Sequence, residues 1–168
     1  MSLINTISSE KPIAIIGIGC RLPGGINSAE SFWNVLKAGK DVIRQVPHDR
    51  WDLDLHFNSD PLNPLTQHVK YGGFVDNIQE FDPAFFGITP REAKCMDPQQ
   101  RMLLEVAWRS IENAGYPVEN LKVKSIGVYT GISSSDYSSL LWVSTEDYVT
   151  PDNEPFILLE ILFSIISL

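Results

Sequence analysis

Two short apolar runs, each closed by glycine, constrain the possible folds of this chain most strongly. Residues 12–19 read PIAIIGIG and residues 125–131 read SIGVYTG. Neither run alternates polar with apolar side chains, which is typical of strands that helices cover on both faces. Helical patterns lie between the two runs, so the sequence predicts an α/β domain in which helices are layered on a sheet.

The strongest local pattern predicts a helix from Asp97 to Gly115. Asp97 suits the N-cap, Pro98 suits the first helical position, and Gln100 stands at the third position of a capping box. Gly115 suits the stop. The helix carries a wide apolar stripe, formed by Met102, Leu103, Leu104, Val106, Ala107, Trp108, Ile111 and Ala114. Because the stripe is wide, we expect this helix to be buried on most sides.

A shorter helix is predicted nearer the N-terminus. Asn27 and Ser28 are suitable cap residues, the helix is expected to run to about Ala38, and Gly39 suits its C-terminal stop. Its apolar face follows the i, i+3, i+4 spacing, with Phe32, Val35 and Leu36.

The segment 41–70 is different in character, because it is rich in proline, aspartate and asparagine and holds all three histidines. We interpret it as irregular structure rather than a linker, since four large apolar side chains there need burial, Trp51, Leu53, Leu55 and Phe57. Residues 71–76 then predict a short strand. Residues 81–87 predict a turn leading into a short helix, with Asp82 as its cap and Pro83 at its first position.

Composition narrows the class of protein. The chain has 168 residues and a net charge of −8, with its basic residues scattered. The Lys and Arg residues form no continuous run that could follow a phosphate backbone, so nucleic-acid binding is not expected. The first residues, MSLINTISSEK, lack the pattern of a signal peptide, and Cys20 and Cys95 are too few for a disulfide scaffold. We therefore expect a cytoplasmic protein with reduced thiols.

The residue types that most often carry catalysis or bind metals form no convincing pattern. His48, His56 and His68 show no metal-ligand spacing, and we expect no metal site. A catalytic thiol needs a base or a helix N-terminus that lowers its pKa, and neither Cys20 nor Cys95 has a histidine near it in sequence. Both cysteines are interpreted as packing residues. A dinucleotide-binding turn after residues 17–19 is also disfavoured, because Leu22 stands where that motif needs glycine.

Several short blocks stand in a distinctive order along the chain. They are PIAIIGIGCRLPGG at 12–25, SFW at 31–33, VP and DRW within 46–51, YGGF at 71–74, FDPAFFGI at 81–88, PREA at 90–93, MDPQQR at 96–101 and GISSSDY at 131–137. Together they resemble the N-terminal part of the β-ketoacyl synthase (ketosynthase) domain of modular type I polyketide synthases. The resemblance extends over about three-quarters of the chain.

The resemblance implies a thiolase-like layered α/β fold, of which this chain would hold only the N-terminal half. It implies an acyltransferase reaction, the decarboxylative Claisen condensation of a cysteine-bound acyl group with a malonyl unit. The partners it implies are an acyl carrier protein bearing phosphopantetheine and a second copy of the domain, with no cofactor bound directly. The family's nucleophile lies in a Thr-Ala-Cys-Ser-Ser-like turn that this sequence does not contain, so no catalytic residue is assigned.

One residue is a candidate for substrate binding. In the family the segment that matches Met96 to Arg101 lies near the floor of the acyl pocket and the dimer interface, which implies a pocket-lining role for Gln100. The simpler interpretation is that Gln100 only caps its helix.

The pattern changes near residue 140. We interpret residues 1–10 as a flexible lead-in, 11–139 as the ketosynthase N-terminal region and 140–168 as a divergent tail, with out-of-frame read-through as its hypothetical origin. The end of this tail is apolar but too short to span a bilayer and is interrupted by Glu160, so no membrane association is expected. We expect a truncated ketosynthase that does not catalyse condensation alone. A non-catalytic dimerisation module, or half of a split enzyme, remains an alternative.

Overall fold

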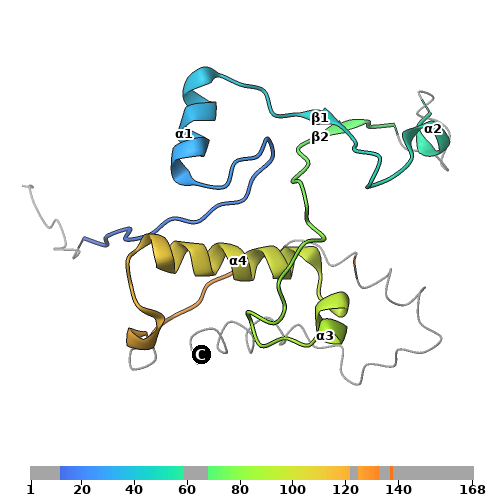
Figure 1. The fold of residues 1–168 in the computed structure, drawn as a ribbon. Helices are drawn as coiled ribbons and strands as arrows, with labels where there is room; N and C mark the ends of the chain where they lie inside the picture. The colour runs from blue at the N-terminus through green and yellow to red at the C-terminus, as the bar shows by residue number, and fades with distance from the viewer. Residues whose placement is uncertain (1–11, 59–67, 122–124, 133–136, 138–168) are drawn as a thin grey trace, which may run out of the picture.

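The computed structural model describes residues 12–58, 68–121, 125–132 and 137 (Figure 1). The elements in chain order are the helices α1 (Ala29–Ala38) and α2 (Leu53–His56), with strand β1 (Arg44–Gln45) between them, then strand β2 (Tyr71–Gly72), the helices α3 (Pro90–Cys95) and α4 (Pro98–Asn113), and a 3-10 turn at Val118–Asn120. The predicted lead-in of residues 1–10 and tail of residues 140–168 lie outside the described residues, so those two boundaries stay predictions.

Local capping builds α1 where the sequence predicts it. The Ser28 hydroxyl accepts a hydrogen bond from the Ser31 amide, and Ser31 returns the contact in a reciprocal capping box. Gly39 ends the helix in the left-handed conformation, with φ 59°. Its apolar face is largely exposed, because Phe32 is 40% and Leu36 is 56% exposed.

The short helix after residue 80 begins later than predicted. Asp82 does accept a hydrogen bond from the Phe85 amide, at 3.1 Å, but residues 83–87 form only turns, and Gly87, with φ 66°, ends them. The helix α3 starts at Pro90 instead. Thr89 and Glu92 form a full capping box around its first turn.

The long helix α4 begins and ends close to the predicted residues, but two details of the prediction are wrong. Asp97 caps through the Gln99 amide at 2.8 Å, so the expected capping box with Gln100 does not form. A cap directed at the second residue already satisfies a free amide of the first turn. The helix is also not buried on most sides, because Leu104 alone is fully buried and every other residue of the apolar stripe is only half-buried.

The main apolar cluster joins α3 and α4. Leu104 is 1% exposed and contacts a small set of buried side chains, Phe86, Ile88, Ala93 and Met96. Around it lie partly buried side chains, Phe81, Leu103, Ala107, Trp108 and Val128. The rings of Phe85 and Trp108 meet edge to face with centroids 4.8 Å apart, a favoured aromatic geometry. This cluster is the core of the described residues.

The second region contains a small hairpin and the short helix α2. β1 and β2 are antiparallel, with Arg44 opposite Gly72, so the strand predicted at 71–76 is confirmed for its first two residues. The burial expected in the segment 41–70 is confirmed for Leu53, which is 8% exposed, whereas Leu55 is 74% exposed. In Figure 1 this region and α1 lie on one side of α4, and α3 lies on the other.

The two predicted buried strands are absent from the described residues. Residues 12–20 and 125–132 have no strand assignment, and Ile13 and Tyr129 are each 96% exposed. A strand needs a hydrogen-bonded neighbour, and neither run has one among the residues that the structure describes. The first run instead lies against α4, where a Cβ added at Gly17 would be 2.2 Å from the Ser110 carbonyl oxygen. Glycine is what permits this close approach.

Candidate functional site

A polar cavity of about 250 Å³ lies where the N-terminal loop, the segment after β2 and α4 meet. Its walls are Arg21, Leu22, Gly25, Ile26, Asn27, Val75, Asp76, Asn77, Glu80, Glu105 and Arg109. These residues come from three parts of the chain that are far apart in sequence. The cavity therefore forms only when the N-terminal loop and the segment after β2 lie against α4.

Arg21 is the lining residue with the most polar contacts to other parts of the chain. Its Nη1 donates to Glu105 Oε2 at 2.7 Å, and its Nη2 donates to the carbonyl oxygens of Asp76 at 3.1 Å and Asn77 at 2.7 Å. The side chains of Arg21 and Glu105 are only 15% and 20% exposed. Hydrogen bonds that involve a charged group are stronger than neutral ones, so Arg21 is firmly held.

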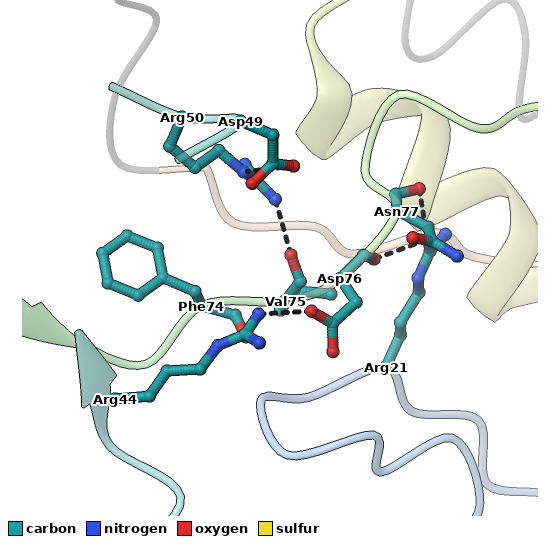
Figure 2. A network of polar contacts seen from close by, with 8 residues as sticks. All are labelled: Arg21, Arg44, Asp49, Arg50, Phe74, Val75, Asp76 and Asn77. Atoms are coloured by element: carbon teal, nitrogen blue, oxygen red, sulfur yellow. Dashed lines mark hydrogen bonds and ion pairs between the residues drawn. The ribbon is translucent and has the colours of Figure 1, made fainter. Parts of the chain in front are cut away.

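Two further arginines bind the same stretch of main chain from the other side (Figure 2). Arg44, in β1, contacts the carboxylate of Asp76 and donates to the carbonyl oxygen of Phe74 at 3.4 Å. Arg50 donates to the carbonyl oxygen of Val75 at 2.5 Å. The carbonyls of residues 74–77 are thus held by three guanidinium groups, which leaves this stretch with many fixed contacts.

This arrangement fits support of the chain better than catalysis. The donors of Arg21 that the contacts identify are directed at protein oxygens, and the carboxylate of Glu105 is engaged by the same side chain. General acid or base work needs a group that exchanges protons near the working pH, and a guanidinium remains protonated throughout. Arg21 thus contributes a fixed positive charge that is paired with Glu105, and it is not a proton-transfer group.

The two cysteines and three histidines do not come together as a catalytic set within the described ranges. Cys20 and Cys95 are both free thiols and half-buried. His48, His56 and His68 are exposed, and across the described residues no hydrogen bond joins a histidine to either thiol. A thiol without such a base lacks the usual activation.

The described part of the chain contains neither a metal-binding cluster nor a membrane-spanning helix. No group of three or more Cys, His, Asp or Glu side chains is placed there to hold a metal ion. The helices found in the described ranges are too short or too polar to cross a bilayer.

Gln100 lies in the first turn of α4 and is half-buried. The backbone amide of Gln100 donates to the Asp97 carbonyl oxygen at 2.9 Å, while the Asp97 carboxylate accepts from the backbone amide of Gln99. Gln100 does not line the polar cavity at Arg21. The structure therefore brings Gln100 to a place separate from that cavity, and its substrate-binding role stays a prediction.

Sequence reasoning missed the Arg21 cavity altogether. Arg21 and Glu105 are 84 residues apart, and Arg21 and Asn77 are 56 apart. No local spacing connects such residues. The one available hint is that Arg21 is a charged residue directly after a glycine-rich turn, where the chain passes close to other backbone.

Comparison with known proteins gives a consistent result. The model of the family described as "Beta-ketoacyl synthase, N-terminal domain" matches residues 10–167. A phenolphthiocerol/phthiocerol polyketide synthase protein of Mycobacterium tuberculosis is 47% identical over 144 residues, which are 86% of this chain and 9% of that protein. Erythronolide synthase EryA2 of Saccharopolyspora erythraea is 46% identical over 140 residues, covering 83% of this chain and 4% of that protein.

Solved structures agree with these sequences. A mutant of the ketosynthase from module 6 of the bacillaene synthase of Bacillus subtilis superposes with a TM-score of 0.76 and 35% identity, covering 92% of this chain and 25% of that one. The oxazolomycin ketosynthase domain OzmH KS7 of Streptomyces albus gives a TM-score of 0.61 at 35% identity, over 65% of this chain and 19% of that one. The expected thiolase-like layered fold, represented by its N-terminal part, is confirmed. The chain spans less than a tenth of the length of the two polyketide synthases described above.

Proposed function

Because this chain belongs to the β-ketoacyl synthase family and matches its N-terminal domain, we propose that it supplies the N-terminal part of a polyketide synthase ketosynthase. The reaction of the family is decarboxylative Claisen condensation, in which a cysteine-bound acyl group is joined to a malonyl unit. In the proposed role, the described residues form part of the folded ketosynthase domain in which that reaction takes place. The match of the family model to residues 10–167 is the observation that carries the proposal.

The chemistry assigned to this chain is limited by its sequence. It contains two cysteines, and neither stands in a Thr-Ala-Cys-Ser-Ser-like turn. Thiolate attack needs an activated sulfur, and the developing oxyanion needs prepared hydrogen-bond donors. We therefore propose that this chain alone does not accept an acyl group. It would take part in condensation only together with residues that supply the nucleophile and the two histidines that, in the family, assist decarboxylation of the malonyl unit and stabilise the oxyanion.

The proposed partners follow from the reaction of the family. The acyl and malonyl groups would arrive as thioesters on the phosphopantetheine arm of an acyl carrier protein, with no cofactor bound directly by this chain. A second ketosynthase copy would complete a dimer. The proposed compartment is the cytoplasm, which agrees with the free thiols of Cys20 and Cys95.

Gln100 is proposed to line the floor of the acyl pocket. It is half-buried at the start of α4, and the Asp97 carboxylate caps the helix through Gln99. Since the Gln100 side chain is not required for that cap, it is available for another contact.

The decisive experiment is a chimera. Residues 12–131 replace the matching segment of an active polyketide synthase ketosynthase, and the acyl-enzyme and condensation rates are measured by mass spectrometry with carrier-bound thioesters. We expect the chimera to retain acylation at its own cysteine and to condense. A chimera that folds as a dimer yet forms no acyl-enzyme would contradict the proposal.

Two controls make the result specific. The isolated chain, given the same thioesters, should remain unlabelled at Cys20 and Cys95. In the chimera, Gln100→Ala should alter the preference for acyl-chain length by several-fold through KM, whereas Gln99→Ala should not. If both variants had the same preference for acyl-chain length, Gln100 would not line the acyl pocket.

A further inference from the structure

The segment 74–77 is held in an unusual way, because its carbonyl oxygens are bound by arginines from three separate parts of the chain (Figure 2). Arg21 precedes α1, Arg44 lies in β1, and Arg50 lies between β1 and α2. The segment itself connects β2 to the apolar cluster at Phe81 and Phe86. Any shift of this segment would therefore change how the hairpin and the cluster are joined.

Arg21 differs from the other two arginines in what it connects. It alone binds both the segment and α4, through the Asp76 and Asn77 carbonyl oxygens on one side and Glu105 on the other. Arg44 and its partner Asp76 have side chains that are 42% and 52% exposed, against 15% and 20% for Arg21 and Glu105. Water screens the outer pair more strongly, so Arg21 carries the stronger contact.

The backbone at this point needs a partner. Asn77 has φ 54°, a left-handed conformation that side-chain-bearing residues seldom adopt. Its carbonyl oxygen accepts from Arg21 at 2.7 Å and from the Glu80 amide at 3.1 Å, which turns the chain toward the apolar cluster. The guanidinium contacts the carbonyls on both sides of the Asn77 Cα, and so it fixes the turn directly.

We propose that Arg21 is a latch that fixes the turn at residues 74–77 on α4 and so sets the position of the hairpin region relative to the α3–α4 core. Glu105 orients the guanidinium and balances its charge. The two terminal nitrogens of Arg21 donate to three protein oxygens, which a lysine ammonium with its single nitrogen does not reproduce. Arg44 and Arg50 hold the same turn from the hairpin side.

The test is hydrogen–deuterium exchange of the full chain, read by mass spectrometry on peptides covering residues 74–80 and, separately, α4. Within residues 74–80 the amide of Glu80 donates to the Asn77 carbonyl oxygen that Arg21 also binds. We expect Arg21→Met to speed exchange at this amide about tenfold and at α4 by less than about twofold, because local opening is separate from global unfolding. Arg21→Lys and Glu105→Gln should give smaller increases at 74–80. Arg109→Met is the matched control, since Arg109 lines the same cavity, and it should leave exchange at 74–80 unchanged.

Two outcomes would overturn the latch. One is equal exchange at 74–80 in wild type and Arg21→Met. The other is a parallel increase at 74–80 and α4, which would mean general destabilisation. Should Arg21→Met fail to fold, Arg21→Lys is measured instead. The increase in its exchange rate at 74–80 is then compared with the increase at α4. None of these outcomes affects the ketosynthase assignment, which rests on the family match.

Discussion

Helices α1 and α4 have the same kind of beginning and different surroundings. Both start at a side-chain cap, Ser28 in α1 and Asp97 in α4. α4 contributes Leu104, 1% exposed, to the apolar cluster, whereas α1 buries no residue, and its Trp33 is 65% exposed. α1 is therefore stabilised mainly by its local caps, whereas α4 is stabilised by its cap and by tertiary burial.

The comparison teaches that the described chain has two levels of stability. The α3–α4 region is held by apolar burial, which contributes about 25 cal/mol for each Å² removed from water. The α1 and hairpin region has fewer buried apolar side chains, Ile26, Val46 and Leu53. It is also held by caps, a two-residue strand pair and the arginine contacts of residues 74–77. Loss of a core side chain should thus affect the whole structure, and loss of a cap should affect one helix.

The largest effect is expected from Leu104→Ala. Removing this fully buried side chain should lower the free energy of unfolding by about 3 kcal/mol, the usual size for a buried leucine replaced by alanine. Urea unfolding followed by circular dichroism measures it. Leu55→Ala is the matched control, because Leu55 is 74% exposed, and it should change stability by less than about 0.5 kcal/mol. Equal losses would remove the distinction between the two regions.

The next effect concerns the contact between the first apolar run and α4. A Cβ at Gly19 would be 2.4 Å from the Val106 carbonyl oxygen, so Gly19→Ala should cost about 1–3 kcal/mol as an overpacking change. Gly131→Ala is the control, since no atom of the described residues lies within 4 Å of a Cβ built there. Proteolysis within residues 12–20 should accelerate only in Gly19→Ala, and an unaltered cleavage rate would show that the run does not depend on this contact.

A smaller effect is expected from the α1 cap. Ser28→Ala removes an acceptor for the Ser31 amide and should destabilise α1 by about 1 kcal/mol. Since α1 buries no residue, amide exchange should increase along α1 and stay constant along α4. Ser28→Asp restores an acceptor and should recover protection. Faster exchange in α4 would mean that the two regions are more tightly coupled than the contacts indicate.

The smallest effect is a pH dependence in α3. The hydroxyl and amide of Thr89 both donate to Glu92 Oε2, at 2.7 and 2.9 Å, and these bonds lower the pKa of that carboxyl. A lowered folded-state pKa gives stability that is present above the unfolded-state value and is lost as pH falls through the folded-state value. Thr89→Val should therefore raise the Glu92 pKa in a carbon-detected NMR titration, and an unchanged titration would contradict this origin.

The helices were predictable because their determinants are local. Ser28 and Gly39 bound α1, and Asp97 and Pro98 begin α4, all within a few residues of the ends that they define. Thr89, Pro90 and Glu92 show the same kind of pattern for α3, which the prediction passed over in favour of Asp82. The strands were not predictable in this way, because residues 12–19 and 125–131 need partners that no local pattern specifies.

The candidate site was less predictable than the fold. The resemblance located Gln100 through the MDPQQR block, but the contacts of Arg21 depend on residues 55 to 84 positions away. A charged side chain in a turn gives no indication of which distant carbonyls it will bind. Such tertiary hydrogen bonds follow from how the elements are packed, and they can be predicted only after that packing is known.

The exposed isoleucines of the first run bear on how the protein should be handled in solution. Ile13, Ile15 and Ile16 are 96%, 83% and 63% exposed, in a run with which no strand of the described residues pairs. Extended chain with apolar side chains readily associates with other chains. Dilution should therefore lower the sedimentation coefficient of purified samples, and protein concentration becomes a quantity to report with every measurement.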